Sequence, residues 1–133
     1  MMKFQWDDVK NYSPLVLAFI GDAVQTMYVR SRLVAKGPHK VNELHKECSE
    51  FVKASAQCRA VHGLMEILTD EEIQIFKKGR NAKSESVPKN ADVTDYRHAT
   101  GFEALLGYLY IQGKEERLLE LLEKAYSIID TKE

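Results

Sequence analysis

The sequence predicts an all-α domain, a bundle of helices around one core. Apolar residues recur at spacings of three and four along most of the chain, which is the period of a helix face. Capping and stop signals divide the chain into helix-sized segments, and no stretch of useful length alternates as a strand does. A length of 133 residues favours one domain, which we expect to span residues 1–133.

The first helix is predicted to begin at the pair Ser13 and Pro14, because serine is a favoured N-cap and proline is favoured at the first helical position. Its apolar pattern should end near Gly37. Apolar residues continue at helical spacing over residues 41–68. We expect one bent helix or two there, because Gly63 and several serines weaken the middle of the pattern.

Thr69 and Glu72 have the spacing of a capping box, so a further helix is predicted to begin there. It should fade at Gly79. Residues 80–93 are polar, contain a proline and show no apolar period, which predicts a loop.

The last third of the chain predicts two more helices. One covers residues 94–111 and ends at Gly113, because glycine readily adopts the left-handed conformation that closes a helix. The other is amphipathic, with leucine and isoleucine residues from Leu118 to Ile129 on one face.

Composition and charge argue against several classes of protein. The formal net charge is -1, so nucleic-acid binding would have to rest on a local cluster of charge. Cys48 and Cys58 are the only cysteines, as in cytosolic proteins whose thiols stay reduced. The N-terminal residues lack the apolar segment of a secretory signal, and the longest apolar run, Leu15–Ile20, is far shorter than the roughly 18 residues of a membrane helix. We therefore expect a cytoplasmic protein with no membrane association.

Residues 77–89, which we call the basic segment, are strongly basic although the chain is not. Five of these residues are basic and one, Glu85, is acidic. Phosphate groups bind such clusters by charge, and structureless segments of about 14 residues in small domains are often functional. The alternative is a solvated loop without a ligand, and the residues alone leave both readings open. The candidates for phosphate contact are Lys77, Lys78, Arg80, Asn81, Lys83 and Lys89.

Two carboxylates, Asp22 and Glu103, lie in apolar helical stretches that are far apart in the sequence. A charge in such surroundings is unfavourable unless it is paired, solvated or bound to a cation. Gly107, one turn after Glu103, permits close helix packing beside the carboxylate. If the two helices pack, the carboxylates could face each other and hold Mg²⁺ or Mn²⁺, which prefer hard oxygen ligands. The alternative is two helix-surface carboxylates with no partnership.

Two histidine-containing candidates carry a weaker signal. His45 and Cys48 have the spacing of half a zinc site, but no second pair lies nearby at finger-like spacing, and Cys48 lies on an apolar stripe. His98 lies five residues before Glu103 and could bind phosphate or orient water, although a surface or packing role is the more frequent one.

Three segments together resemble a known family. LAFIGDAV, at residues 17–24 of the first helix, resembles the signature segment of ribonuclease III. YRHATGFEALLGYLY resembles the second acidic segment of that family, and KKGRNAKSESVPKN suits an RNA contact. The whole chain is similar to the bacterial mini-ribonuclease III branch of the family.

The resemblance implies a ribonuclease III-type endonuclease domain that forms a two-fold homodimer. It implies Mg²⁺-dependent cleavage of double-stranded RNA, which leaves 5′-phosphate and 3′-hydroxyl ends. The mini branch implies a role in maturation of the 23S (large-subunit) ribosomal RNA precursor, with a large-subunit ribosomal protein assisting. By resemblance, Asp22 and Glu103 match the catalytic metal-binding carboxylates, Phe19 packs across the dimer interface, and the basic segment contacts RNA.

The chain departs from the larger members of the family at two positions. Ala18 and Thr100 stand where those enzymes carry further carboxylates, so water, the Thr100 hydroxyl or phosphate oxygens would have to complete an ion's shell. The appended double-stranded RNA-binding domain of larger members is not expected in this sequence. The departures keep two rival readings open: a non-catalytic double-stranded RNA-binding protein on the same fold, and a helical interaction module without a nucleic-acid role.

Overall fold

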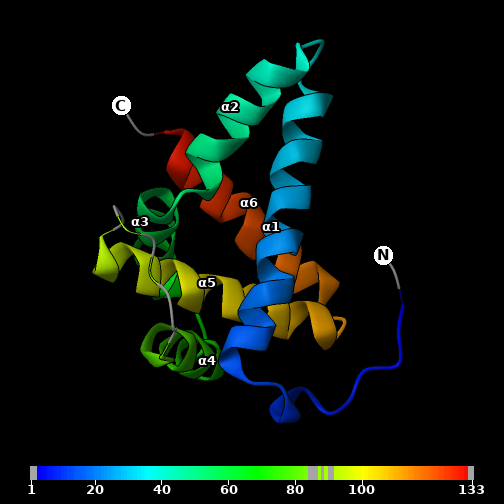
Figure 1. Cartoon of the computed structure of the whole chain (residues 1–133). Helices are drawn as coiled ribbons and strands as arrows, with labels where there is room; N and C mark the ends of the chain where they lie inside the picture. The colour runs from blue at the N-terminus through cyan, green and yellow to red at the C-terminus, as the bar shows by residue number, and fades with distance from the viewer. Residues whose placement is uncertain (1–2, 84–86, 88, 90–91, 132–133) are drawn as a thin grey trace.

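The computed structural model describes residues 3–83, 87, 89 and 92–131 (Figure 1). These residues form six α-helices and two short 3₁₀ turns, and they contain no strand. The helices are α1 (Pro14–Ala35), α2 (Val41–Val52), α3 (Ala54–Leu64), α4 (Asp70–Asn81), α5 (Val93–Ile111) and α6 (Glu115–Asp130). The 3₁₀ turns cover Val9–Asn11 and Met65–Ile67. The prediction of an all-α fold is confirmed.

Helix α5 lies at the centre of the fold. Figure 1 shows it running across the middle of the molecule, crossed by α1 and flanked by α3 and α4, and all three of these helices contact it. Every residue from Ala99 to Leu109 is buried except Glu103, which is half-buried. The stretch therefore has no polar face, and Glu103 is the one charged group within it.

The predicted helix starts are confirmed by their hydrogen bonds. The Ser13 hydroxyl accepts the Val16 backbone N–H at 3.2 Å, and Pro14 is the first residue of α1. The capping box of α4 is complete, because the Thr69 hydroxyl accepts the Glu72 N–H at 3.1 Å and the Glu72 carboxylate accepts the Thr69 N–H at 2.9 Å. Gly113 follows α5 with a φ of 71°, in the left-handed region expected of it.

Residues 41–68 form two helices, and the break lies at Lys53. Its extended backbone, with φ of -68° and ψ of 155°, ends α2 and starts α3. Gly63 is not the weak point that the sequence suggested. It lies inside α3, where an added Cβ would meet Ile128 Cδ1 at 2.7 Å, so its small size serves the packing of α3 on α6.

Helix α4 continues two residues beyond Gly79, the predicted stop. A Cβ at Gly79 would lie 2.8 Å from both Ala104 Cβ and Gly101 Cα. This glycine therefore allows α4 to pack closely on α5 and does not end the helix. The loop predicted over residues 80–93 is shorter, because α5 already begins at Val93 with Asp92 as its N-cap. Residues 84–86, 88 and 90–91 of that loop lie outside the described residues.

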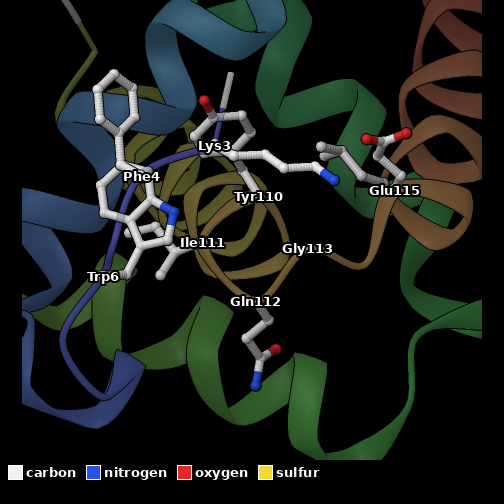
Figure 2. A pocket seen from close by; sticks show the side chains of 9 residues that line it. Lys3, Phe4, Trp6, Tyr110, Ile111, Gln112, Gly113 and Glu115 are labelled. Atoms are coloured by element: carbon white, nitrogen blue, oxygen red, sulfur yellow. The ribbon is translucent and has the colours of Figure 1, made fainter. Parts of the chain in front are cut away.

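The N-terminal segment packs beside the end of α5. Figure 2 shows Phe4 and Trp6 of this segment next to Tyr110, and the ring centroids of Trp6 and Tyr110 are 5.9 Å apart in an edge contact. Together with Lys3 and Glu115 they line a pocket of about 510 Å³ whose lining includes neither Asp22 nor Glu103. Among the described helices, none has the length and apolar character needed to cross a membrane.

Candidate active site

The crossing of α1 and α5 brings Asp22 and Glu103 together. Two glycines make this crossing close: a Cβ at Gly21 would lie 1.8 Å from the Glu103 carbonyl oxygen, and one at Gly107 would lie 2.0 Å from the Leu17 carbonyl oxygen. Backbone therefore touches backbone on both sides of the carboxylates. The Asp22 and Glu103 side chains share a hydrogen bond across the contact.

The two carboxyl groups differ in their surroundings. Asp22 is exposed, whereas Glu103 is half-buried between α1 and α3. Burial, reinforced by the negative charge of Asp22 and by the hydrogen bond between them, raises the pKa of Glu103 to about 8. Without a cation, the pair therefore holds one proton at neutral pH, mostly on Glu103.

Two buried glutamines form a hydrogen-bonded chain that ends at Glu103. Gln57 of α3 and Gln25 of α1 are only 1% and 2% exposed. The Gln57 Nε2 group donates to Gln25 Oε1 at 2.5 Å and to Glu103 Oε2 at 3.3 Å. The second bond favours the charged carboxylate and lowers the pKa of Glu103. The sequence analysis assigned neither glutamine to the site, and the only signal at Gln57 is an amide among the apolar residues of α3.

The residues present suit a hydrated divalent cation. The donors are carboxylate oxygens, one of them exposed to solvent, which is the ligand type that Mg²⁺ and Mn²⁺ select. The buried Gln57 Oε1 accepts no hydrogen bond from the described residues, which leaves one polar atom next to the site without a protein partner. A cation would also remove the repulsion that keeps a proton on Glu103.

Ala18 and Thr100 occupy the two positions at which the larger enzymes carry further carboxylates. Ala18 is buried one turn before Asp22 and offers no ligand. Thr100, one turn before Glu103, donates its hydroxyl hydrogen to the Tyr96 carbonyl at 3.0 Å, so its oxygen can serve the site only as an acceptor or ligand. An ion held by Asp22 and Glu103 would therefore need water or substrate oxygens as its other ligands.

The basic segment begins on the last turn of α4. Lys77, Lys78, Arg80 and Asn81 are helical, and Lys83 and Lys89 follow. All are exposed except Arg80, which lies over the Phe76 ring at 5.7 Å and donates to Asn81 Oδ1 at 3.1 Å. Because Gly79 packs on Gly101, the cationic end of α4 is fixed to the same turn of α5 that precedes Glu103.

Phe19 lies on the outer side of α1, away from the core. It is 81% exposed, and its neighbours Val16 and Met27 are 49% and 66% exposed. These residues form an apolar stripe along α1, which we call the α1 stripe.

The remaining candidates lie elsewhere. Cys48 is in the core and His45 is exposed, so they do not converge. His98 lies against His62 of α3, with ring centroids 5.0 Å apart, and its ring Nδ1 is paired with the Thr94 carbonyl oxygen of its own helix.

Comparisons with known proteins agree with this arrangement. The profile of the Ribonuclease III domain matches residues 15–114. The chain is 53% identical to the Mini-ribonuclease 3 of Brevibacillus brevis over 118 residues, which cover 89% of this chain and 88% of the relative. It is 44% identical to the Mini-ribonuclease 3 of Staphylococcus aureus over 128 residues, covering 95% and 96%.

A solved structure shares the fold. The crystal structure of a Fusobacterium nucleatum protein superposes with a TM-score of 0.81 at 29% identity, covering 92% of this chain and 98% of that one. The domain match spans the α1–α5 crossing and both carboxylates. The chain therefore belongs to the ribonuclease III family of endoribonucleases that act on double-stranded RNA, within its mini-ribonuclease III branch.

Proposed function

We propose that this chain cleaves double-stranded RNA at the Asp22–Glu103 pair with Mg²⁺ as its cofactor, and that Mn²⁺ can replace it. The observation that carries the proposal is the convergence of two carboxylates at a glycine-mediated helix crossing, with a raised pKa at Glu103. Such a pair is electrostatically unfavourable without a cation, and perturbed carboxyl groups of this kind gather at functional sites.

Asp22 and Glu103 would hold the ion through their carboxylate oxygens. When bound, Mg²⁺ polarises the scissile phosphate and lowers the pKa of a coordinated water. Gln57 keeps the Glu103 carboxylate in one orientation through its 3.3 Å hydrogen bond, and Gln25 in turn holds Gln57. The glutamines thus position a ligand without reaching the substrate themselves.

The expected reaction is an in-line displacement at phosphorus. The attacking water releases a proton to solvent as its oxygen forms a bond to phosphorus. The bond from phosphorus to the 3′ oxygen breaks, and the leaving 3′ oxygen takes up a proton from solvent. The products are a 5′-phosphate and a 3′-hydroxyl end. These end groups follow from the family resemblance and are open to direct mapping.

The basic segment would bind the duplex through its phosphates. The minor groove of an A-form duplex displays phosphates and 2′-hydroxyls and carries little sequence information, so exposed lysines suit it. Lys77 and Lys78 lie on the α4 turn that Gly79 packs against α5, the helix that carries Glu103, and this shared packing supports a role of the lysines in holding the duplex.

The α1 stripe would form the two-fold interface of a homodimer, with Phe19 at its centre. Burial of an aromatic side chain that is 81% exposed in one subunit would contribute roughly 1.5–3 kcal/mol to association. A two-fold axis would place two sites against two antiparallel strands, one for each cut. Sedimentation of a Phe19→Ser variant as a monomer would support this interface, and an unchanged dimer would exclude it.

For the biological substrate, the resemblance points to the 23S ribosomal RNA precursor in the cytoplasm, with a large-subunit ribosomal protein assisting. The test is incubation of the purified protein with structured precursor, with and without Mg²⁺, followed by mapping of both ends. Specific cuts that need the ion support the proposal. Non-specific degradation of the precursor would restrict it to duplex cleavage in general.

The catalytic role of the carboxylates is tested with Asp22→Asn and Glu103→Gln on a short RNA duplex. We expect cleavage to fall by about 10²–10³-fold in each, with duplex binding retained. Glu116→Gln, at an exposed carboxylate on α6, is the matched control and should cleave as the wild type does. If the wild-type protein binds the duplex but does not cut it with Mg²⁺ present, the chain is an RNA-binding protein on this fold.

A further inference from the structure

A second cluster of metal-ligating side chains lies between α3 and the start of α5. Cys58 and His62 are one turn apart on α3, and His98 faces them from α5. Their potential donor atoms all lie within 4.8 Å of one another. Cys58 is buried, His98 is half-buried and His62 is exposed, so the cluster lies at the protein surface with its thiol on the inner side.

The separation of the Cys58 and His62 donor atoms matches a tetrahedral metal centre. Zn–S and Zn–N bonds of about 2.3 and 2.0–2.1 Å at a tetrahedral angle place the sulfur and nitrogen roughly 3.6 Å apart. The Cys58 Sγ and His62 Nδ1 atoms are 3.7 Å apart. Coordination would therefore need little movement of α3.

The His98 ring is already oriented for the same centre. Its Nδ1 lies 2.8 Å from the Thr94 carbonyl oxygen, so Nδ1 carries the proton and donates, and Nε2 keeps its lone pair. This is the arrangement of a zinc-bound histidine, whose other ring nitrogen usually donates to a carbonyl or carboxylate. Packing against Phe76, with ring centroids 5.7 Å apart, restricts the ring further.

Acidic neighbours favour a cation at this place. The Cys58 thiol is hydrogen-bonded to the Asp95 carboxylate, and Asp92 adds negative charge nearby. Burial, and then these carboxylates, raise the pKa of the Cys58 thiol to about 11, so the metal-free thiol is protonated. A bound cation would favour the thiolate form of Cys58 over the thiol, and the thiol proton would leave to solvent as the metal–sulfur bond forms.

We propose that Cys58, His62 and His98 form a binding site for a zinc-class transition metal, with a water as the fourth ligand. A thiolate and two imidazoles bind Zn²⁺ far more tightly than Mg²⁺, whereas the carboxylates of the Asp22–Glu103 pair are ligands of the type that suits Mg²⁺. The two sites therefore discriminate between ions by ligand chemistry.

The place of this site in the fold gives the metal a structural effect. The ligands join α3 to the first turns of α5, where the chain returns from the basic segment (Figure 1). Gln57, which donates to Glu103, is the residue before Cys58. The metal would fix α3, which carries Gln57, against the start of α5, which follows the basic segment proposed to contact RNA.

The test is titration of the purified, chelator-treated full chain with Co²⁺, a spectroscopic substitute for Zn²⁺. We expect one equivalent to bind, with a near-ultraviolet thiolate-to-metal charge-transfer band and the strong visible bands of tetrahedral Co²⁺. Zn²⁺ should abolish both signals and raise the melting temperature, and excess Mg²⁺ should leave them unchanged. Competition by Mg²⁺ would assign the ion to the carboxylates and overturn the proposal.

Variants separate this site from other thiols and imidazoles of the chain. Cys58→Ala should lose the charge-transfer band, and His62→Ala and His98→Ala should each weaken Co²⁺ binding by at least about 10-fold. His62 is exposed, so its replacement leaves the packing intact and tests the ligand role alone. Cys48→Ala and His45→Ala are matched controls and should bind as the wild type does. Unchanged binding in His62→Ala, or loss of the band in Cys48→Ala, would overturn the proposal whatever the result for RNA cleavage.

Discussion

Replacement of Gly21 by alanine should separate the two carboxylates and destabilise the fold. The added Cβ would lie 1.8 Å from the Glu103 carbonyl oxygen, 2.7 Å from the Glu103 carbonyl carbon and 2.9 Å from the Gly107 nitrogen. These are backbone atoms, so no side-chain rotation relieves the clash. Contacts of a real Cβ essentially never fall below 3.0 Å, so α1 and α5 must move apart by about 1.2 Å at this point.

The magnitude follows from two opposing effects. Overpacking of this kind costs about 1–3 kcal/mol, and alanine returns up to about 1 kcal/mol of helix propensity relative to glycine. We expect a net loss of about 1–2 kcal/mol in the free energy of unfolding. A displacement of about 1 Å at the reacting groups can reduce the rate about 10²-fold, so cleavage should fall by more than stability alone explains.

The assay is urea unfolding together with duplex cleavage at saturating Mg²⁺, at a temperature where the variant is fully folded. Gly63→Ala is the matched control, because the three atoms nearest to its added Cβ all belong to the Ile128 side chain and none is backbone. That variant should unfold within about 1 kcal/mol of the wild type and cleave normally. A Gly21→Ala protein that is as stable and as active as the wild type would refute the close-crossing argument.

Three further predictions follow from the site. In the absence of divalent ions, Glu103 has a pKa of about 8 in the folded chain and 4.5 when unfolded. Its contribution to stability is therefore fully present below pH 4.5 and is lost as pH rises through 8. Melting temperatures measured in chelator should fall over this range, and Mg²⁺ or the Glu103→Gln substitution should flatten the decline. Gln57→Leu leaves Gln25 Oε1 without its hydrogen-bond donor, so we expect the free energy of unfolding to fall by about 1–3 kcal/mol. The substitution also removes the donor that lowers the pKa of Glu103, so the cleavage pH profile should shift to higher pH. Alanine at Lys77, Lys78 and Lys83 should weaken duplex binding and reduce the slope of log K against log salt by roughly one for each lysine that binds a phosphate in the wild type.

Each of these predictions has a control. Gln74→Leu, an exposed glutamine on α4, should leave the pH profile unchanged. Alanine at Lys36, Lys40 and Lys46, exposed residues of the α1–α2 end, should leave the salt slope unchanged. A flat melting temperature across pH in chelator, an unshifted profile for the Gln57 variant, or equal salt slopes for the two lysine triples would contradict the corresponding argument.

The features that were predictable from the sequence are local ones. The cap at Ser13, the capping box at Thr69 and the closing glycine at Gly113 act through neighbours within a few residues, and all three are present as predicted. The carboxylates were recognisable because Asp22 and Glu103 are charges in otherwise apolar helices. Local chemistry identified the caps directly. It marked the two carboxylates only as candidates, and the resemblance of LAFIGDAV and YRHATGFEALLGYLY to segments of ribonuclease III predicted that they act as a pair.

The features that escaped prediction depend on contacts between distant segments. Gly79 has the local signature of a helix stop, yet its role is to let α5 pack against α4. Gln57 becomes functional only because α3 lies beside both α1 and α5. The histidine–cysteine pair suggested by spacing is His45 and Cys48. The pair with a third metal-ligating side chain close by is Cys58 and His62, because His98 reaches them from a different helix, α5.

The scarcity of carboxylates at this site predicts that ion and RNA bind cooperatively. Asp22 and Glu103 supply few ligands, Ala18 supplies none, and the proton on Glu103 must leave before its carboxylate can bind an ion. Phosphate oxygens of the duplex can occupy the remaining positions, so each partner should strengthen binding of the other by the same factor, typically about 5–150-fold. The measurement is duplex affinity with and without Ca²⁺, a hard cation that takes the same oxygen ligands, in the wild type and in Asp22→Asn. Equal enhancement by Ca²⁺ in both proteins would show that the ion acts on the RNA alone, and would refute the shared site.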